Sequence, residues 1–222
     1  MCVRKWFYNE SFFEAIDTKA KAYFLGLLMA DGNIINTKRS SKQIQITCIN
    51  SDSYILDMLR NEIGYIKPLT FRERIRNETQ THSCEINLYS VKMYNDLINL
   101  GITPKKGALE SFVNMTLIPD NLKINFWMGY FDGDGSINKD DGYIVLCFNG
   151  ETYNIFTEYI SPYLDNEIRV LSIKNRDNSI LNKVILKKND SLNFLKKCYE
   201  NNDYFLTRKK DIFDKHIKNL QK

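Results

Sequence analysis

Two runs of apolar residues, 23–32 and 126–135, are the strongest pattern in the chain. Each run has helical character, carries a small residue in its middle, and ends in an aspartate followed by glycine. The two aspartates, Asp31 and Asp134, are 103 residues apart (134 − 31). Because glycine readily takes the left-handed conformation that closes a helix, each run predicts a helix with a carboxylate at its end.

The first half continues as an alternation of strands and helices. Residues 43–49 alternate apolar and polar side chains, which is typical of a strand with one buried face. Ser51-Asp52 offers an N-cap for the next helix, and Gly64 and Gly101 mark helix ends. The predicted order is a motif helix over 19–30, a strand over 43–49, a helix to about 63, strands over 68–76 and 81–89, and a helix over 91–100.

The second half repeats this order, which indicates a duplicated unit. Its predicted elements are the second motif helix, a strand over 143–149, a helix over 151–161, strands over 168–175 and 180–188, and helices over 190–200 and 207–219. Short local echoes agree with duplication: residues 48–50 match 147–149, and residues 103–106 match 207–210. We therefore expect an α+β fold with two repeats, 1–115 and 116–222, related by a pseudo-twofold axis.

Composition narrows the class of protein. The 222 residues are 43% hydrophobic and 13% aromatic, as expected of a folded chain with a large core. No apolar stretch is long enough to span a membrane, and the N-terminus lacks a secretion signal. Five scattered cysteines predict free thiols in a reducing compartment. With only two histidines, we expect no histidine-based metal site. The net charge of +4 is mild. Lysines and arginines gather in short runs, which indicate either a surface that binds a polyanion or, for any single run, an ordinary solubilising surface.

With both motifs and the repeat, the chain resembles the LAGLIDADG homing endonucleases of the monomeric, two-motif kind. The matching residues are Phe24 to Gly32 and Trp127 to Gly135, and the resemblance covers nearly the whole chain. It implies two αββαββα repeats that form a saddle of antiparallel sheets, with the motif helices packed at the centre. The small residues Gly26, Ala30, Gly129 and Gly133 would allow the two helices to approach closely. Met29 and Trp127-Met128 depart from the motif at packing positions only.

The resemblance also implies an active site. Asp31 and Asp134 would be catalytic and would hold Mg²⁺, or Mn²⁺ or Ca²⁺ in its place, together with the backbone at Ala30 and Gly133. Carboxylate-held Mg²⁺ suits the hydrolysis of a phosphodiester. Asp132 would support the site or face solvent. A basic residue near the last helix of each half would complete the site: Lys106 and Lys209, with Lys105 and Lys210 as alternatives. A phosphate contact is a further role for the run that begins at Arg208.

The strand pairs of this family straddle duplex DNA, and alternating side chains on the concave face contact base edges in the major groove. The second half alternates less clearly than the first, so its candidates rest on charge alone. The predicted DNA-binding residues are Lys38, Arg39, Lys42, Gln43, Gln45, Thr47, Thr70, Arg72, Arg74, Arg76, Ser83, Glu85 and Asn87 in the first half, and Lys139, Arg169, Lys174, Arg176, Lys183 and Lys187 in the second.

The leading hypothesis is therefore a monomeric, site-specific endonuclease that makes a metal-dependent double-strand cut in a long, partly asymmetric DNA target. Alternatives of the same fold are a splicing cofactor (maturase) that binds intron RNA, and a DNA-binding regulator that does not cut. An ordinary α+β interaction domain is the alternative from another class. We expect a cytoplasmic protein of a phage or bacterial host, or a protein of an organelle matrix, that is not secreted. The chain ends do not resemble a protein splice junction, so we expect no self-splicing segments.

Overall fold

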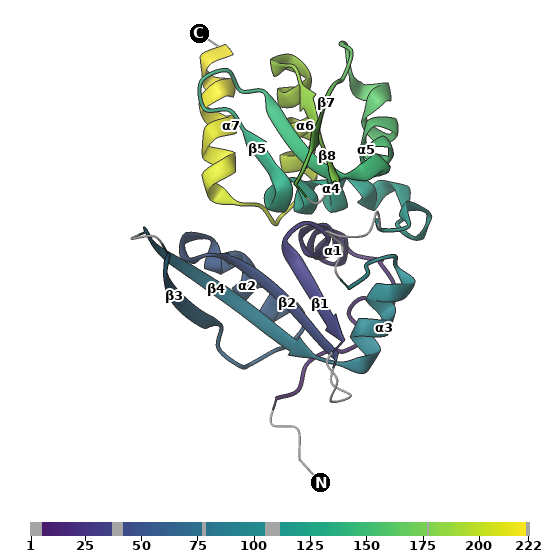
Figure 1. The fold of residues 1–222 in the computed structure, drawn as a ribbon, viewed down its shortest axis with the longest axis vertical. Helices are drawn as coiled ribbons and strands as arrows, with labels where there is room; N and C mark the ends of the chain where they lie inside the picture. The colour runs from purple at the N-terminus through teal and green to yellow at the C-terminus, as the bar shows by residue number, and fades with distance from the viewer. Residues whose placement is uncertain (1–5, 37–41, 77–78, 105–111, 177, 221–222) are drawn as a thin grey trace.

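The computed structural model describes residues 6–36, 42–76, 79–104, 112–176 and 178–220. Within these ranges the two halves share one order of elements, to which the second half adds a final helix (Figure 1). The first half comprises α1 (Lys19–Asp31), β1 (Gly32–Asn36), β2 (Lys42–Ile49), α2 (Ser53–Glu62), β3 (Thr70–Arg76), β4 (Thr79–Tyr89) and α3 (Val91–Asn99). The second comprises α4 (Asp120–Asp134), β5 (Gly135–Ile137), β6 (Ile144–Asn149), α5 (Tyr153–Ile160), β7 (Arg169–Lys174), β8 (Ile180–Leu186), α6 (Lys188–Asn201) and α7 (Thr207–Leu220).

Each half forms one four-stranded antiparallel sheet. The strand orders are β1-β2-β4-β3 and β5-β6-β8-β7, so the second sheet repeats the topology of the first. Figure 1 shows α1 and α4 between the two sheets, at the middle of the molecule. The predicted α+β fold with two repeats and central motif helices is confirmed.

One face of each sheet is covered by helices, and we call the other its open face. Helices α2 and α3 pack on the first sheet, and α5 packs on the second. The alternation predicted for residues 43–49 is confirmed, because Ile44 and Ile46 are 2% exposed while Gln43 and Gln45 are half-buried on the open face. Strand β6 alternates in burial too, although its residues from Ile144 to Phe148 are all apolar.

The glycines after the two motif aspartates do not close their helices in the left-handed conformation, so this prediction is wrong. Gly32 (φ −76°) and Gly135 (φ −92°) are extended and begin the strands β1 and β5. A Cβ atom on Gly32 would lie 2.6 Å from the carbonyl oxygen of Leu28, and one on Gly135 would lie 2.5 Å from that of Phe131. Glycine is needed here because the strand starts against the last turn of the helix. Gly64 and Gly101 do take positive φ after their helices, as predicted.

The motif helices α1 and α4 approach so closely that backbone touches backbone. A Cβ atom on Gly26 would lie 2.0 Å from the carbonyl oxygen of Phe126, and one on Gly129 would lie 1.9 Å from that of Tyr23. Gly133 lies against Ala30 in the same way, with its Cβ position 2.3 Å from the methyl group. The prediction that small residues permit this approach is confirmed.

Two expectations from composition concern the described residues alone. The cysteines at 48, 84, 147 and 198 are free thiols, as predicted, while Cys2 lies outside the described residues. Across the described ranges, no helix is both long and apolar enough to cross a membrane.

Candidate active site and nucleic-acid interface

The carboxylates of Asp31 and Asp134 lie at the adjacent ends of the two motif helices. Asp31 is the last residue of α1, Asp134 is the last residue of α4, and both are exposed. The carboxyl carbon of Asp31 lies 3.4 Å from the position that a Cβ atom on Gly133 would occupy. The packing of the helices therefore places the carboxylate of Asp31 beside the last turn of α4, which ends in Asp134.

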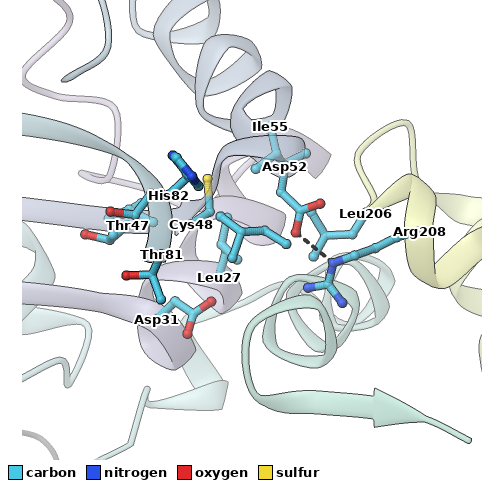
Figure 2. Close-up of a pocket in the computed structure, with 13 residues that line it drawn as sticks. Leu27, Asp31, Thr47, Cys48, Asp52, Ile55, Thr81, His82, Leu206 and Arg208 are labelled. Carbon is cyan, nitrogen blue, oxygen red and sulfur yellow. Dashed lines mark hydrogen bonds and ion pairs between the residues drawn. The ribbon is translucent and has the colours of Figure 1, made fainter. Parts of the chain in front are cut away.

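Asp31 lines a cavity of about 340 Å³ between the two halves of the molecule (Figure 2). Arg208, at the start of α7, lines the same cavity from the other half. Its Nε donates a hydrogen bond of 2.8 Å to Oδ2 of Asp52, and about half of its side chain is exposed. A carboxylate and an arginine thus flank one cavity, which is a suitable arrangement for a metal ion and a phosphate group.

Asp52 has a different role from the one that the sequence predicted. It precedes α2, but its side chain makes no capping hydrogen bond and instead accepts from Arg208. Asp52 is 3% exposed, so its charge is paired in a buried position. Helix α2 therefore lacks a side-chain capping hydrogen bond from Asp52, and the carboxylate instead holds Arg208 of the other half beside the cavity.

Lys209 is buried under the end of α4. Its Nζ donates to the carbonyl oxygens of Phe131 (2.6 Å), Asp132 (2.8 Å) and Gly135 (2.6 Å), and the residue is 3% exposed. Burial lowers the pKa of its ammonium group to about 8, although the charge of Asp132 opposes this shift. Lys209 therefore fixes the helix terminus that carries Asp134, with its three hydrogens directed at backbone acceptors.

Lys209→Met is expected to lower the free energy of unfolding by about 2–3 kcal/mol, because buried carbonyl groups lose their donor. Lys210→Met is the matched control on the same helix, since Lys210 pairs with Asp214 at the surface and should change stability by less than about 0.5 kcal/mol. Urea denaturation of both variants measures the difference. Equal effects would show that the contacts of Lys209 with α4 contribute little.

Asp132, two residues before Asp134, is buried and forms hydrogen bonds with residues of both halves. Its Oδ2 accepts hydrogen bonds from the Tyr23 hydroxyl (2.8 Å) and from the backbone N–H of Leu206 (2.9 Å). Oδ1 is buried without a hydrogen-bond partner among the described residues. Burial raises the pKa of this carboxyl to about 6. Of the two roles predicted for Asp132, the solvent-facing one is wrong, because the residue is 1% exposed.

The segment that leads into α7 crosses to the first half. The hydroxyl of Tyr204 donates to Glu62 at 2.6 Å, and its ring stacks on Tyr23 of α1. The hydroxyl of Tyr54 donates to the carbonyl oxygen of Phe205 at 3.1 Å. With the Arg208–Asp52 pair, these contacts fix the orientation of the two halves around the carboxylates.

Lys210, the alternative to Lys209, does not line this cavity. Lys210 pairs with Asp214 and lines a groove between α6 and α7. Lys105 and Lys106 are outside the described residues. Among the predicted cations that the structure describes, Arg208 lines the cavity of Asp31, and Lys209 is buried against the end of α4.

The open face of the first sheet carries the polar residues that the sequence predicted to face outward. The strand register places them on one face: Gln43, Gln45 and Thr47 on β2, Ser83, Glu85 and Asn87 on β4, and Thr70, Arg72 and Arg74 on β3. Arg76 pairs with Thr79 at the end of β3. This surface combines the donors and acceptors that recognise base edges in the major groove.

Glu85 organises this face. It accepts hydrogen bonds from Arg72 Nη2 (2.5 Å), Asn87 Nδ2 (2.8 Å) and Gln45 Nε2 (3.1 Å), and these contacts leave it 3% exposed. The bond from Arg72 holds the pKa of the Glu85 carboxyl below its usual range. The predicted position of Glu85 on the open face is confirmed, but the carboxylate is engaged with its neighbours in the same face.

The candidates of the second half are scattered. Arg169 and Lys183 lie on the open face of the second sheet, whereas Lys174 lies on the opposite face, in register with Ile180. Arg176 is in the turn after β7, Lys139 is in the turn after β5, and Lys187 precedes α6 and donates to Asn166. In the first half, Lys42 begins β2 and donates to Asn36, while Lys38 and Arg39 are outside the described residues.

Comparison with solved structures identifies the fold. The homing endonuclease I-WcaI, bound to its DNA recognition sequence, aligns over 92% of this chain and 91% of its own, with a TM-score of 0.62 and 16% identity. I-DmoI in complex with DNA and Ca aligns over 86% and 90% (TM-score 0.46, 16% identity), and the LAGLIDADG homing endonuclease I-LtrWI bound to target DNA over 88% and 90% (TM-score 0.47, 10% identity).

Sequence comparison adds one relative of limited coverage. The DNA-directed RNA polymerase subunit Rpo1C of Methanocaldococcus jannaschii is 26% identical over 135 residues, which are 58% of this chain and 14% of that protein. The chain therefore spans about one seventh of the relative that it matches. No protein-family model matches the chain.

Proposed function

We propose that this chain, which has the two-repeat fold of the LAGLIDADG homing endonucleases, is a site-specific endonuclease that cuts both strands of a long, partly asymmetric DNA target. The observation that carries the proposal is the pair of exposed carboxylates, Asp31 and Asp134, at the adjacent ends of two helices in backbone contact. Two acidic groups beside a twofold axis can serve two strands, one cut each. The polar open face of the first sheet supplies a surface for the major groove.

The site is suited to Mg²⁺, with Mn²⁺ or Ca²⁺ as substitutes. No group of three or more His, Cys, Asp or Glu side chains that could hold a metal occurs in the part of the chain that the structure describes. Two carboxylates and the backbone carbonyls of Ala30 and Gly133 would leave positions for phosphate oxygens and water, which Mg²⁺ prefers in such sites. When bound, the metal would activate water and stabilise charge on the phosphoryl oxygens.

The basic residues around the carboxylates would contact phosphate and position Asp134. Arg208, held by Asp52 at the edge of the cavity, would contact a phosphate near the cut. Lys209 would position Asp134 by fixing the end of α4. Lys106 would act from the other repeat. We propose the monomer as the acting form, because one chain supplies both aspartates.

Arg72→Ala is expected to weaken discrimination at a particular base pair by about 1–3 kcal/mol, since arginine reads guanine through two hydrogen bonds. Glu85→Gln should relax the same base pair to a smaller extent, because Arg72 loses its charged acceptor. Cleavage of target libraries randomised one position at a time measures both effects. A uniform loss over all positions would show that Arg72 contacts phosphate.

A cleavage selection tests the proposed function directly. Purified protein is incubated with a pooled genomic DNA library, with Mg²⁺ or with EDTA, and the ends produced are sequenced. We expect recurrent, Mg²⁺-dependent ends at one long sequence. Folded protein that yields no such ends with any divalent metal would refute endonuclease activity, and binding to intron RNA would then be measured.

A further inference from the structure

The open face of the second sheet is mainly apolar, unlike its counterpart in the first. Three strands contribute three residues each: Val145, Cys147 and Asn149 from β6, Leu181, Lys183 and Ile185 from β8, and Arg169, Leu171 and Ile173 from β7. Leu171 is 38% exposed and Ile173 is 41% exposed. We call these nine residues the apolar reading face.

The strand register aligns this face with the polar one, position by position. Gly32 pairs with Ile46 and Gly135 pairs with Leu146, which matches β2 to β6, and the ladders to β4 and β8 extend the match. The polar residues are replaced in a consistent manner: Gln45 by Val145, Thr47 by Cys147, Asn87 by Ile185, Ser83 by Leu181, Thr70 by Leu171 and Arg72 by Ile173, while Glu85 is replaced by Lys183.

These replacements remove hydrogen-bonding groups but keep a surface for contact. An exposed sheet face is normally polar, and contiguous exposed apolar side chains indicate a binding surface. In the major groove, thymine alone presents an apolar group, its C5 methyl, which aliphatic side chains contact. An aliphatic face would leave the polar edges of guanine and cytosine desolvated without partners, at a cost in free energy.

We propose that the apolar reading face recognises a thymine-rich half-site through the C5 methyl groups, while the first sheet reads its half-site through hydrogen bonds. This inference rests on the proposed endonuclease function and specifies its substrate. DNA is favoured over an apolar protein partner because Lys183 lies at the centre of the face and Arg169 at its edge, and both charges suit a polyanion. The second sheet repeats the strand order of the first, so the apolar reading face is the counterpart of the polar open face.

The test removes methyl groups from the DNA. In the target found by the cleavage selection, deoxyuridine replaces thymidine in one half-site at a time, which deletes the C5 methyl and leaves base pairing intact. The half-site bound by the first sheet is identified as the one at which Arg72→Ala changes the discrimination between bases. Binding measured in Ca²⁺ should weaken about three- to fourfold per methyl group removed under the apolar reading face. The same replacement in the other half-site should change binding less than twofold.

A protein variant supplies the second arm. Ile173→Asn should abolish the sensitivity to deoxyuridine at one position, and because the side chain is 41% exposed the fold should be retained. Ile75→Asn, at a 78% exposed isoleucine on the covered side of the first sheet, is the matched control and should leave that sensitivity unchanged.

Specific cutting with indifference to deoxyuridine, or a G·C-rich half-site, would overturn the inference and leave the proposed function intact. If binding does not change with deoxyuridine, and if the protein forms a dimer that Ile173→Asn dissociates, the face would instead be assigned to contact with a second copy of the chain. If the protein neither cuts nor binds a specific DNA duplex, the inference and the proposed function both fail.

Discussion

Asp31→Asn and Asp134→Asn are each expected to abolish double-strand cleavage while DNA binding is largely retained. Asparagine keeps the shape of the side chain but removes the charge that would hold a divalent metal. A loss of at least about 10³-fold in cleavage rate, or about 4 kcal/mol of activation free energy, is expected for each variant. Both residues are exposed ends of helices, so the fold should not change.

Cleavage of a supercoiled plasmid that carries the target measures this effect, because nicked and linear products separate single-strand from double-strand cutting. Binding is measured in parallel by fluorescence anisotropy in Ca²⁺. Asp17→Asn is the matched control: this exposed aspartate precedes α1 and pairs with Lys21 at the surface. If either active-site variant cuts both strands at nearly the wild-type rate, the assignment of the carboxylates is wrong.

The sequence predicts the repeat and the motif helices because these depend on periodicity. Apolar residues at helical spacing and alternating residues such as Gln43 to Cys48 report burial directly, and burial defines the fold. The predicted αββαββα repeat has two strands after each motif helix, but the sequence placed only the second of each pair, over 43–49 and 143–149. The first strands, β1 and β5, begin at Gly32 and Gly135 and are short, and a glycine after an apolar helix is easily read as a helix end. Their pairing with β2 and β6 is a tertiary property that local patterns do not contain.

The active-site contacts were predicted less well than the fold, for a related reason. In the run Arg208-Lys209-Lys210, three consecutive cations point in three directions from one helix turn: to Asp52, to the end of α4, and to Asp214. Only the packing of α7 against α4 and the first half decides which is buried. The partnership of Tyr23 with Asp132 spans 109 residues and leaves no local signal. Glu85 was placed on the correct face, but its burial depends on side chains from neighbouring strands.

Gly129→Ala is expected to lower the free energy of unfolding by about 4 kcal/mol or more, since the added methyl would lie 1.9 Å from a backbone carbonyl oxygen of α1. Helix propensity acts in the opposite direction: alanine in place of glycine would stabilise an isolated helix by about 1 kcal/mol. The sign of the measured change therefore separates the two effects. Because neither backbone can move aside, the helices must separate along their contact.

Thermal and urea denaturation of Gly129→Ala, with Gly26→Ala as the equivalent change in α1, test this prediction. Asn121→Ala, in the exposed first turn of α4, is the control for alanine in this helix and should be neutral. A stable Gly129→Ala protein would mean that the close approach of α1 and α4 is not required for folding. Because the same contact sets the separation of Asp31 and Asp134, any folded fraction of Gly129→Ala should also cut DNA poorly. Stability and cleavage are thus expected to fall together at this position, whereas the aspartate variants lose cleavage alone.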